Sequence, residues 1–388
     1  MQKRMFSPKE NPFYWSPENH TLLTQNFSRK ELHHLFHNFR NIDYFNMLLG
    51  YAGDITETTD LFEFLDSKDL DQLRFKKTFL IFDATFEGYS QLHKPLISAL
   101  TYSAKKYNVD PKKIFLFTGN FKDDSNDINV VPIFLLDGDW SWDGHRLDID
   151  QSKKDCFNNY EKMILSLSRR NRYLRVIGHF ALYHSSIIDQ CMVSQDRLDN
   201  NITVSKDALQ KLSLNEVDWN IFKNNLPLLV DGNNFHINSP FDPLPLLHSK
   251  TLFSIVNETL ISNYNDTSLF FSEKLLKPIM NFQPLVIYGQ PGINKKINML
   301  GFKTYENYFD LSFDDEPDDI IRYKKLLSSI EETARYLKSL NREQQVEWRY
   351  KEKELLNYNY QVFVRKENTK EQLELFSKKL TSVFLTKS

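Results

Sequence analysis

The sequence has few cysteines and no long apolar run, and both absences limit what the protein can be. Its 388 residues include only two cysteines, Cys156 and Cys191. They are too few for a disulfide framework, and their spacing is not that of a metal site. No run of about 18 apolar residues could span a bilayer, and the first residues lack the apolar centre of a signal peptide. We therefore expect a cytoplasmic protein without an integral membrane segment.

The charge and size narrow the class further. The 49 basic and 51 acidic side chains are interspersed and give a formal net charge of −2, so no overall field would attract a polyanion. Apolar residues make up 41% of the chain, with 31 Phe but only 11 Gly and 14 Pro, as in ordinary globular proteins. A chain of this length exceeds one hydrophobic core, which predicts two domains.

Short apolar runs alternate with helical spacing in the first part of the chain. The runs TFLIFD (78–83), KIFLF within 110–120, and VVPIFLL (130–136) are typical of buried parallel strands. Connections of this kind build a right-handed parallel sheet that binds ligands at the carboxyl ends of its strands. We predict an N-terminal Rossmann-like domain over residues 1–150.

The same pattern restarts after a polar, acidic stretch at 137–155. Three more apolar runs follow at 162–168, 252–258 and 284–289. They predict a second Rossmann-like domain over 151–325. The remaining residues, 326–388, have the charged composition of amphipathic helices and are predicted to form a helical extension.

Charged residues follow several of the predicted strands in the second half. Glu258 ends one strand, and Glu273 and Lys274 stand at a predicted helix start. A basic turn after another strand contains Arg169, Arg170, Arg172 and Arg175. Strand ends of one parallel sheet meet at a common crevice, where a carboxylate binds a ribose diol and the cations and a helix N-terminus bind phosphates. The pattern indicates a nucleotide diphosphate site, with ordinary solvated surface charges as the alternative.

The same residues carry a resemblance to a known family. The run FSIVNETLISNYNDTSLFFSEKLLKPIMNFQPLVIYGQPG (253–292) resembles the donor-binding core of the alpha-1,3-fucosyltransferases. It is closer to related bacterial and viral glycosyltransferases with a Ser-Glu-Lys-x-x-Lys-Pro-Ile motif, here residues 272–279. Gly301-Phe302-Lys303-Thr304 and the acidic segment 310–319 match later elements of that group. The resemblance covers about residues 160–325.

The resemblance implies a GT-B glycosyltransferase, in which two Rossmann-like domains face a central cleft. The donor, a GDP- or UDP-linked sugar, would bind the C-terminal domain and the acceptor would lie mainly against the N-terminal one. Carried over from the family, Glu273 would hold the ribose, and Glu258 would lie close to the sugar or ribose. The diphosphate would be held by Lys274 and by one or more of Arg169, Arg170 and Arg175. Asn257-Glu258-Thr259 stand here in place of the family's Glu-Asn-Ser.

The expected chemistry is an inverting transfer that needs neither a metal nor a cofactor beyond the donor. Cations stabilise the departing diphosphate, and a general base takes the proton of the acceptor hydroxyl. Glu87, after the first buried strand of the N-terminal domain, is the predicted base, and Asp83 at the end of that strand is the second candidate. The acceptor can be a glycan, a protein, a small molecule or a modified DNA base.

Other interpretations stand beside this one. Asp137-Gly138-Asp139 matches the Asp-x-Asp metal site of the other large glycosyltransferase fold, but it is also a good turn sequence. His179 and His184 are five residues apart, which does not place both on one helix face as a zinc site requires. The alternative function is a non-catalytic carbohydrate- or nucleotide-binding protein, and a third is an epimerase or hydrolase of sugar nucleotides.

Overall fold

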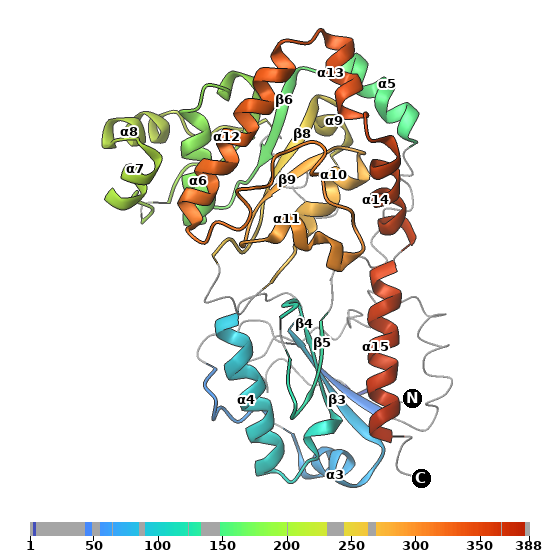
Figure 1. Cartoon of the computed structure of the whole chain (residues 1–388). Coiled ribbons are helices and arrows are strands. Elements are labelled where there is room, and N and C mark those ends of the chain that lie inside the picture. The colour runs from blue at the N-terminus through green and yellow to red at the C-terminus, as the bar shows by residue number, and fades with distance from the viewer. Residues whose placement is uncertain are drawn as a thin grey trace. The chain divides into compact units, whose positions relative to one another are not determined.

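The computed structural model divides the chain into two compact units, each built on a parallel β-sheet (Figure 1). Unit 1 comprises Met1–Trp140, Tyr264–Phe271 and Lys366–Ser388, and unit 2 comprises Ser141–Asn263 and Ser272–Arg365. The residues that the structure describes are 3–4, 43–48, 55–63, 65–84, 90–122, 124–132, 148–199, 201–230, 244–262, 269–365 and 367–384. Each unit is described below by itself.

The sheet of unit 1 has its strands in chain order. The strands are β1 (Lys3–Arg4), β2 (Asp43–Leu48), β3 (Thr78–Ala84), β4 (Ile114–Thr118) and β5 (Asn129–Pro132). Their spatial order is β1-β2-β3-β4-β5, and every neighbouring pair is parallel. Because right-handed crossovers that always step in one direction stay on one side, the connecting helices belong on a single face of this sheet.

One face of the sheet carries those connecting helices. They are α3 (Ser67–Phe75), which enters β3, and α4 (Ser90–Lys106), which joins β3 to β4. Alternate strand residues, Leu80, Phe82 and Leu116, form a buried core cluster together with apolar residues of both helices. The alternation follows from the two-residue period of a strand.

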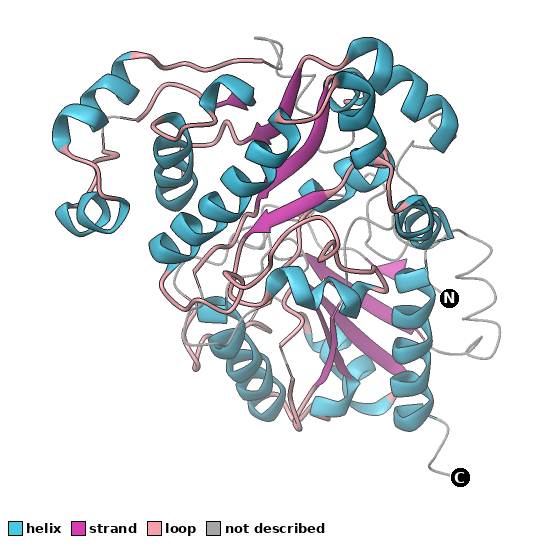
Figure 2. Ribbon diagram, turned by 45° about the horizontal axis from the view of Figure 1, so that its top comes forward, coloured by secondary structure: helices cyan, strands magenta, loops and turns pink. Residues whose placement is uncertain are grey.

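The opposite face is covered by the last helix of the chain, α15 (Glu367–Phe384). The ring of Phe376 lies 6.1 Å from that of Phe79, 5.3 Å from Phe115 and 5.2 Å from Phe117, measured between centroids. Figures 1 and 2 show α15 running beside the strands of this sheet. Unit 1 therefore completes its core only when the C-terminal segment is in place.

Replacing Phe376 with Ala removes the ring that covers three phenylalanines of the sheet. We expect the free energy of unfolding of unit 1 to fall by about 3–5 kcal/mol, the usual effect of a Phe-to-Ala change in a core. Chemical unfolding followed by circular dichroism measures the change. The control is Leu375→Ala on the same helix, because Leu375 is 37% exposed. Equal effects of the two substitutions would contradict this account of α15.

The sheet of unit 2 changes direction in its middle. Its strands are β6 (Lys162–Leu167), β7 (Cys191–Ser194), β8 (Thr251–Asn257) and β9 (Leu285–Tyr288), in the spatial order β7-β6-β8-β9, all parallel. From β6 the chain steps to one side, to β7, whereas from β8 it steps to the other side, to β9. The carboxyl ends of β6 and β8 therefore form a topological switch point, the usual ligand position in open parallel sheets.

Helices cover both faces of this second sheet. On one side α6 (Tyr173–Tyr183) packs against α12 (Asp319–Lys338). The two helices approach closely at Gly178, where an added Cβ would lie only 2.9 Å from Cε2 of Tyr323. The remaining helices of the unit are α5 (Ile149–Asn159), α7 (Lys206–Leu212), α8 (Glu216–Asn224), α9 (Pro245–Ser249), α10 (Leu276–Met280), α11 (Ile293–Lys296), α13 (Arg342–Arg349) and α14 (Lys353–Arg365).

A buried arginine fixes the amino ends of the strands in unit 2. Arg349 is 1% exposed, and its guanidinium donates to the carbonyl oxygens of His248, Thr251 and Asn281 at 2.6 Å each. These carbonyls stand at the start of β8 and in the segment before β9. The five donors of a guanidinium let one side chain satisfy several main-chain acceptors that would otherwise be buried without partners.

The predicted α/β class is confirmed: the chain has two Rossmann-like units followed by C-terminal helices, and in this sense its fold is GT-B-like. The first segment of unit 1 ends at Trp140, whereas the predicted boundary was at residue 150. The residues of the predicted helical extension belong to unit 2 as far as Arg365 and to unit 1 from Lys366 onward. Residues 149–159, which begin within the polar, acidic stretch at 137–155, form α5. Its buried stripe is only Ile149, Ser152 and Cys156, which explains why hydrophobic spacing did not identify it.

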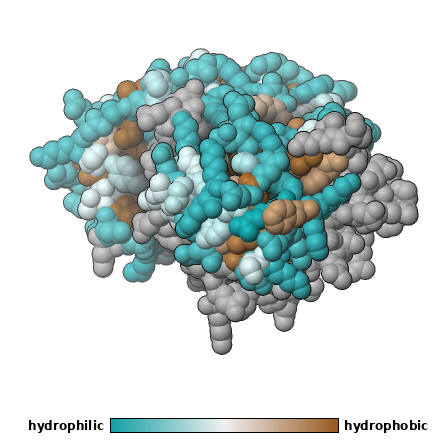
Figure 3. Space-filling model, turned by 90° about the horizontal axis from the view of Figure 1, so that it is seen from below, coloured by the Kyte–Doolittle hydropathy of each residue, from teal (hydrophilic) through white to brown (hydrophobic). Residues whose placement is uncertain are grey.

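The described residues on the face shown in Figure 3 are mainly hydrophilic. On the face shown in Figure 3, hydrophobic side chains form separate small groups among hydrophilic ones. The most exposed large apolar residues lie on different helices: Phe75 on α3, Val217 on α8 and Leu246 on α9. Single exposed apolar residues of this kind are normal on a globular protein. No helix of the described residues is both long enough and apolar enough to cross a membrane.

Candidate functional site

The turn after β6 and the segment after β8 meet at the switch point of unit 2. Nη1 of Arg172 donates to the carbonyl oxygen of Thr259 at 2.8 Å. Nε of Arg175, in the first turn of α6, donates to the carbonyl oxygen of Glu258 at 2.8 Å. The sequence places these segments more than 80 residues apart, and the adjacency of β6 and β8 brings them together.

Thr259 is the point where three cations converge. Its Oγ1 accepts from Nη2 of Arg175 at 3.0 Å and from Nζ of Lys274 at 3.1 Å, in addition to the contact of its carbonyl with Arg172. Nζ of Lys274 also lies 3.3 Å from Oγ of Ser272. We call Arg172, Arg175 and Lys274, gathered around Thr259, the cationic cluster. Such a cluster favours an anionic ligand with several oxygens.

Glu258 connects the end of β8 to the segment that carries Lys274. Its side chain is fully buried, and its two carboxylate oxygens accept from the main-chain N–H of Thr259 at 2.8 Å and of Ser272 at 3.1 Å. One carboxylate thus joins the end of β8 to the residue before the 3₁₀ turn Glu273–Leu275. Lys274 reaches Thr259 because Glu258 fixes the start of that turn.

The predicted arginines take different positions. Arg175 belongs to the cationic cluster, whereas Nη2 of Arg169 forms an ion pair with Oδ1 of Asp196 at 3.0 Å and Arg170 is exposed. Arg172 was not among the residues predicted to hold the diphosphate, but it joins the cluster. A usable signal was its spacing, because residues three apart at a helix start share one face and Arg172 precedes Arg175 by three.

The other candidate site residues singled out in the sequence are all carboxylates. Glu273 is the first residue of the 3₁₀ turn and directly precedes Lys274. Asp83 is in β3 of unit 1, in register with Leu48 of β2 and Phe117 of β4. Glu87, Asp137 and Asp139 lie outside the described residues. Within the described part of the chain, no three His, Cys, Asp or Glu side chains are grouped as metal ligands.

A buried polar network lies beside the cluster and joins three strands to α6. Nε2 of His179 is 2.9 Å from Oγ of Ser166 on β6, and Nδ2 of Asn257 on β8 is also 2.9 Å from that oxygen. Nδ1 of His179 lies 3.1 Å from Oε1 of Gln195, just after β7. Burial lowers the pKa of His179 to about 4, and the nearby charge of Arg175 acts in the same direction. The imidazole is therefore neutral at physiological pH.

His184, the second histidine of the same segment, takes no part in this network. Its Nε2 lies 2.9 Å from the carbonyl oxygen of Asp218, at the start of α8. The two histidines thus serve separate packing contacts.

The acidic segment 310–319 serves the fold. Asp314 is buried, and its carboxylate accepts from the main-chain N–H of Asn294 at 3.2 Å and of Lys295 at 3.1 Å. Burial raises the pKa of Asp314 above its ordinary value, while these hydrogen bonds oppose the shift. Asp318 caps α12 through the N–H groups of its first residues. These carboxylates are occupied by structural contacts at the carboxyl end of β9.

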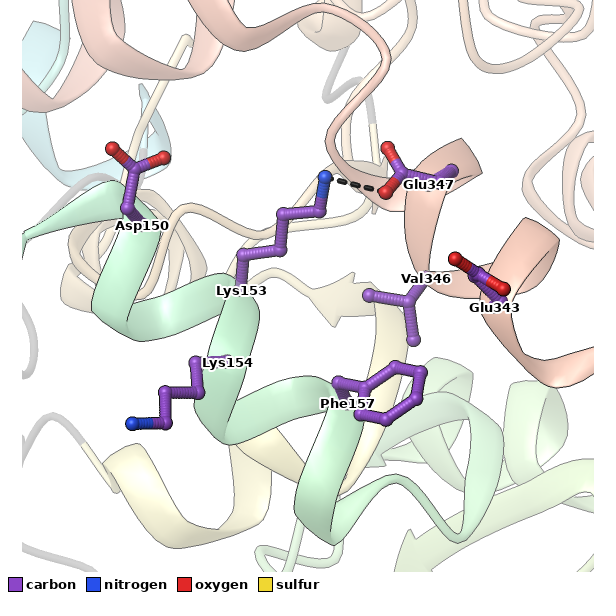
Figure 4. Close-up of a pocket in the computed structure, with 7 residues that line it drawn as sticks. All are labelled: Asp150, Lys153, Lys154, Phe157, Glu343, Val346 and Glu347. Carbon is purple, nitrogen blue, oxygen red and sulfur yellow. Dashed lines mark ion pairs between the residues drawn. The ribbon is translucent and has the colours of Figure 1, made fainter.

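A cavity of about 350 Å³ lies on another part of unit 2, between α5 and α13 (Figure 4). An ion pair between Nζ of Lys153 and Oε1 of Glu347, 2.6 Å long, stands at its edge, and the ring of Phe157 forms part of its wall. Its lining contains no residue of the switch point. The residues that converge at the strand ends therefore make the stronger candidate site.

Comparison with known proteins gives little beyond the fold. No protein-family model and no curated protein matches the chain. Among solved structures, the chain is similar to the trehalose-6-phosphate synthase OtsA, with 10% sequence identity and a TM-score of 0.37. The similarity covers 81% of this chain and 74% of the other. A likeness this distant has no bearing on substrates or site residues.

The neutral state of His179 predicts a loss of stability in acid. Its pKa of about 4 in the folded chain lies below the 6.5 of an unburied histidine, so the unfolded chain binds the proton more readily. Its contribution is complete above pH 6.5 and is lost as the pH falls towards 4, by about 3 kcal/mol in all. Unfolding free energies measured between pH 7 and 4 should fall less steeply for His179→Gln than for the wild type. The control variant His184→Gln should keep the wild-type slope, and equal slopes for all three proteins would contradict the assignment.

Proposed function

We propose that this protein is a glycosyltransferase that transfers a sugar from a nucleotide-diphosphate sugar to an acceptor hydroxyl. The observation that carries the proposal is the convergence of Arg172, Arg175 and Lys274 on Thr259 at the switch point of unit 2. In parallel sheets with this topology, nucleotides bind at such a point with their phosphates beside the helix that follows the first strand.

The N-terminus of α6 supports the position of the phosphates. Its N-cap is Arg172, whose side chain makes no capping hydrogen bond to the first turn. The N–H groups of that turn and the partial positive charge of the helix end favour an anion there. Because Arg172 and Arg175 stand on this same turn, helix and side chains act on the same ligand oxygens.

The chemistry of sugar transfer requires what this cluster supplies. When the glycosidic bond to the diphosphate breaks, negative charge develops on the leaving oxygens, and fixed cations stabilise it. The guanidinium groups of Arg172 and Arg175 and the compact ammonium group of Lys274 supply positive charge at this position. We propose that these side chains take the role that a divalent metal has in other sugar transfers, so that the reaction is metal-independent.

The role of Glu273 follows from the resemblance to the alpha-1,3-fucosyltransferases, whereas the roles of Glu258 and of the general base are proposed from their positions at or after strand ends. Glu273 would hold the ribose of a GDP- or UDP-linked donor, and Glu258 would position the segment that carries Lys274. Glu87 is the proposed general base for an inverting transfer, with Asp83 as the alternative. The acceptor would be a glycan, a protein, a small molecule or a modified DNA base.

Removal of one cation should weaken the binding of a nucleoside diphosphate. A charge-assisted hydrogen bond contributes about 1.5–3 kcal/mol, so Lys274→Ala and Arg175→Lys should each lower the affinity for GDP or UDP roughly 10- to 100-fold. Arg175→Lys retains the charge but loses the fork of donors. Isothermal titration calorimetry measures the change. The matched controls are Lys277→Ala and Arg170→Ala, and losses as large in these controls would contradict the assignment of the site.

Chelation tests the metal-independent mechanism. Turnover of the donor, followed as release of nucleoside diphosphate in the presence of acceptor, should be unchanged by excess EDTA because side chains provide the positive charge. An activity that EDTA abolishes and Mn²⁺ or Mg²⁺ restores would contradict the proposal. In that case Asp137 and Asp139 become the candidates for a metal site.

A further inference from the structure

Two buried polar atoms at the switch point have no hydrogen-bond partner among the described residues. They are Oγ of Ser168, just after β6, and Oδ1 of Asn257, at the end of β8. Ser168 is 5% exposed and Asn257 is completely buried. A buried polar atom without a partner destabilises a fold, so its retention points to a ligand that supplies the missing contact.

The two side chains are neighbours. The register of β6 and β8 pairs Ser166 with Ile255, and Ser168 and Asn257 each stand two residues further along their strands. Residues two apart on a strand point to the same face, and Nδ2 of Asn257 lies 2.9 Å from Oγ of Ser166. The register therefore places Ser168, the first residue after β6, across from Asn257 at the carboxyl ends of the two strands. The contacts of Asn257 with Ser166 and His179 place its side chain on the face that α6 covers.

The buried network determines which way the amide of Asn257 points. Nε2 of Gln195 donates to the main-chain carbonyl of Asp196 at 3.3 Å, so its Oε1 is the atom that faces Nδ1 of His179. Nδ1 of the neutral imidazole must then carry the hydrogen, and Nε2 is an acceptor. Nδ2 of Asn257 lies 3.2 Å from that Nε2. The nitrogen of the amide thus faces the network, and Oδ1 faces away from it.

We propose that Ser168 and Asn257 form a subsite for a carbohydrate hydroxyl of the nucleotide sugar, an inference that rests on the proposed function. Oδ1 of Asn257 only accepts, so its partner must donate, and an ionised phosphate cannot. Oγ of Ser168 both donates and accepts, as a sugar hydroxyl does. Asn257 precedes Thr259 by two residues, which places the subsite next to the cationic cluster. The groups attached directly to a diphosphate are the ribose and the transferred sugar, and both carry such hydroxyls.

The subsite predicts opposite effects of two serine substitutions on the ligand-free protein. Ser168→Ala deletes an atom with no partner, so the Tm should be unchanged or higher. Ser166→Ala, two residues earlier on β6, deletes an oxygen bonded to His179 and Asn257, so the Tm should fall. A Tm lowered as much by Ser168→Ala as by Ser166→Ala would show that Ser168 has a structural partner and would overturn the inference.

Binding measurements test the ligand directly. The probes are GDP and UDP, their 2′-deoxy forms, GDP-mannose and UDP-glucose, and inorganic pyrophosphate, which has phosphates but no hydroxyl. Loss of one hydrogen bond should lower affinity about tenfold. We expect this loss for Ser168→Ala and Asn257→Ala with a probe that carries the hydroxyl, and no change with pyrophosphate.

The probes also identify the hydroxyl. If it is the ribose 2′-hydroxyl, the wild type binds the 2′-deoxy nucleotide about tenfold more weakly than the ribonucleotide, and the variants do not discriminate. If it is the ribose 3′-hydroxyl, the variants lose affinity for the ribonucleotide and for its 2′-deoxy form alike. If it belongs to the transferred sugar, the loss occurs with the nucleotide sugars alone.

Two results would overturn the subsite and leave the proposed function intact. The first is wild-type affinity of both variants for every probe, and the second is an equal loss with pyrophosphate, which would show that the substitutions disturb the cationic cluster instead. If the wild-type protein binds neither pyrophosphate nor any nucleotide, the proposed function fails together with the subsite.

Discussion

Every polar group of Thr259 is engaged, and the candidate site depends on these bonds. Its N–H donates to Glu258, its carbonyl accepts from Arg172, and its hydroxyl accepts from Arg175 and Lys274. One residue, through its main chain and its short side chain, thereby holds the end of β8, the start of α6 and the 3₁₀ turn at Glu273–Leu275 in a single arrangement. The positive charges of Arg172, Arg175 and Lys274 repel one another at this distance, and the oxygen atoms of Thr259 between them reduce that repulsion. The cationic cluster is therefore already arranged to bind the negative charge of a ligand.

The two sheets show how connection order decides where a ligand can bind. In unit 1 the described strands follow chain order, so the described part of the sheet has no switch point. The face of this sheet opposite α3 and α4 is covered by α15, through contacts between aromatic rings. In unit 2 the order reverses between β6 and β8, and helices cover both faces. Buried arginines donate hydrogen bonds to main-chain carbonyls at both ends of the strands in this sheet. Arg349 does so at the amino ends. Arg322 donates to the carbonyls of Gly289 and Ile261 at the carboxyl ends.

Local patterns in the sequence predicted six of the nine described strands, because a buried parallel strand needs a continuous apolar run. They missed β1, which has two residues, β2, whose sequence DYFNML mixes polar and apolar residues, and the four-residue β7. The convergence of Glu258, Lys274 and Arg175 was also expected, since residues at strand ends of one sheet meet. The three-residue spacing of Arg172 and Arg175 selects these two arginines only once the start of α6, at Tyr173, is known. The hydrogen bonds among Ser166, His179 and Asn257 depend on which strands lie side by side in the sheet. The sequence around each of these residues does not indicate which strands pair. An amphipathic helix such as α15 likewise reveals its apolar stripe but not the sheet that it covers.

The central claim is that a nucleoside diphosphate binds at the switch point of unit 2, and hydrogen exchange followed by mass spectrometry locates such binding directly. The experiment compares the exchange of main-chain amides with and without saturating GDP or UDP. The account predicts slower exchange in the segments 168–176, 257–260 and 272–276. Protection confined to the residues of α5 and α13 around the cavity, or to other parts of the chain, would contradict it.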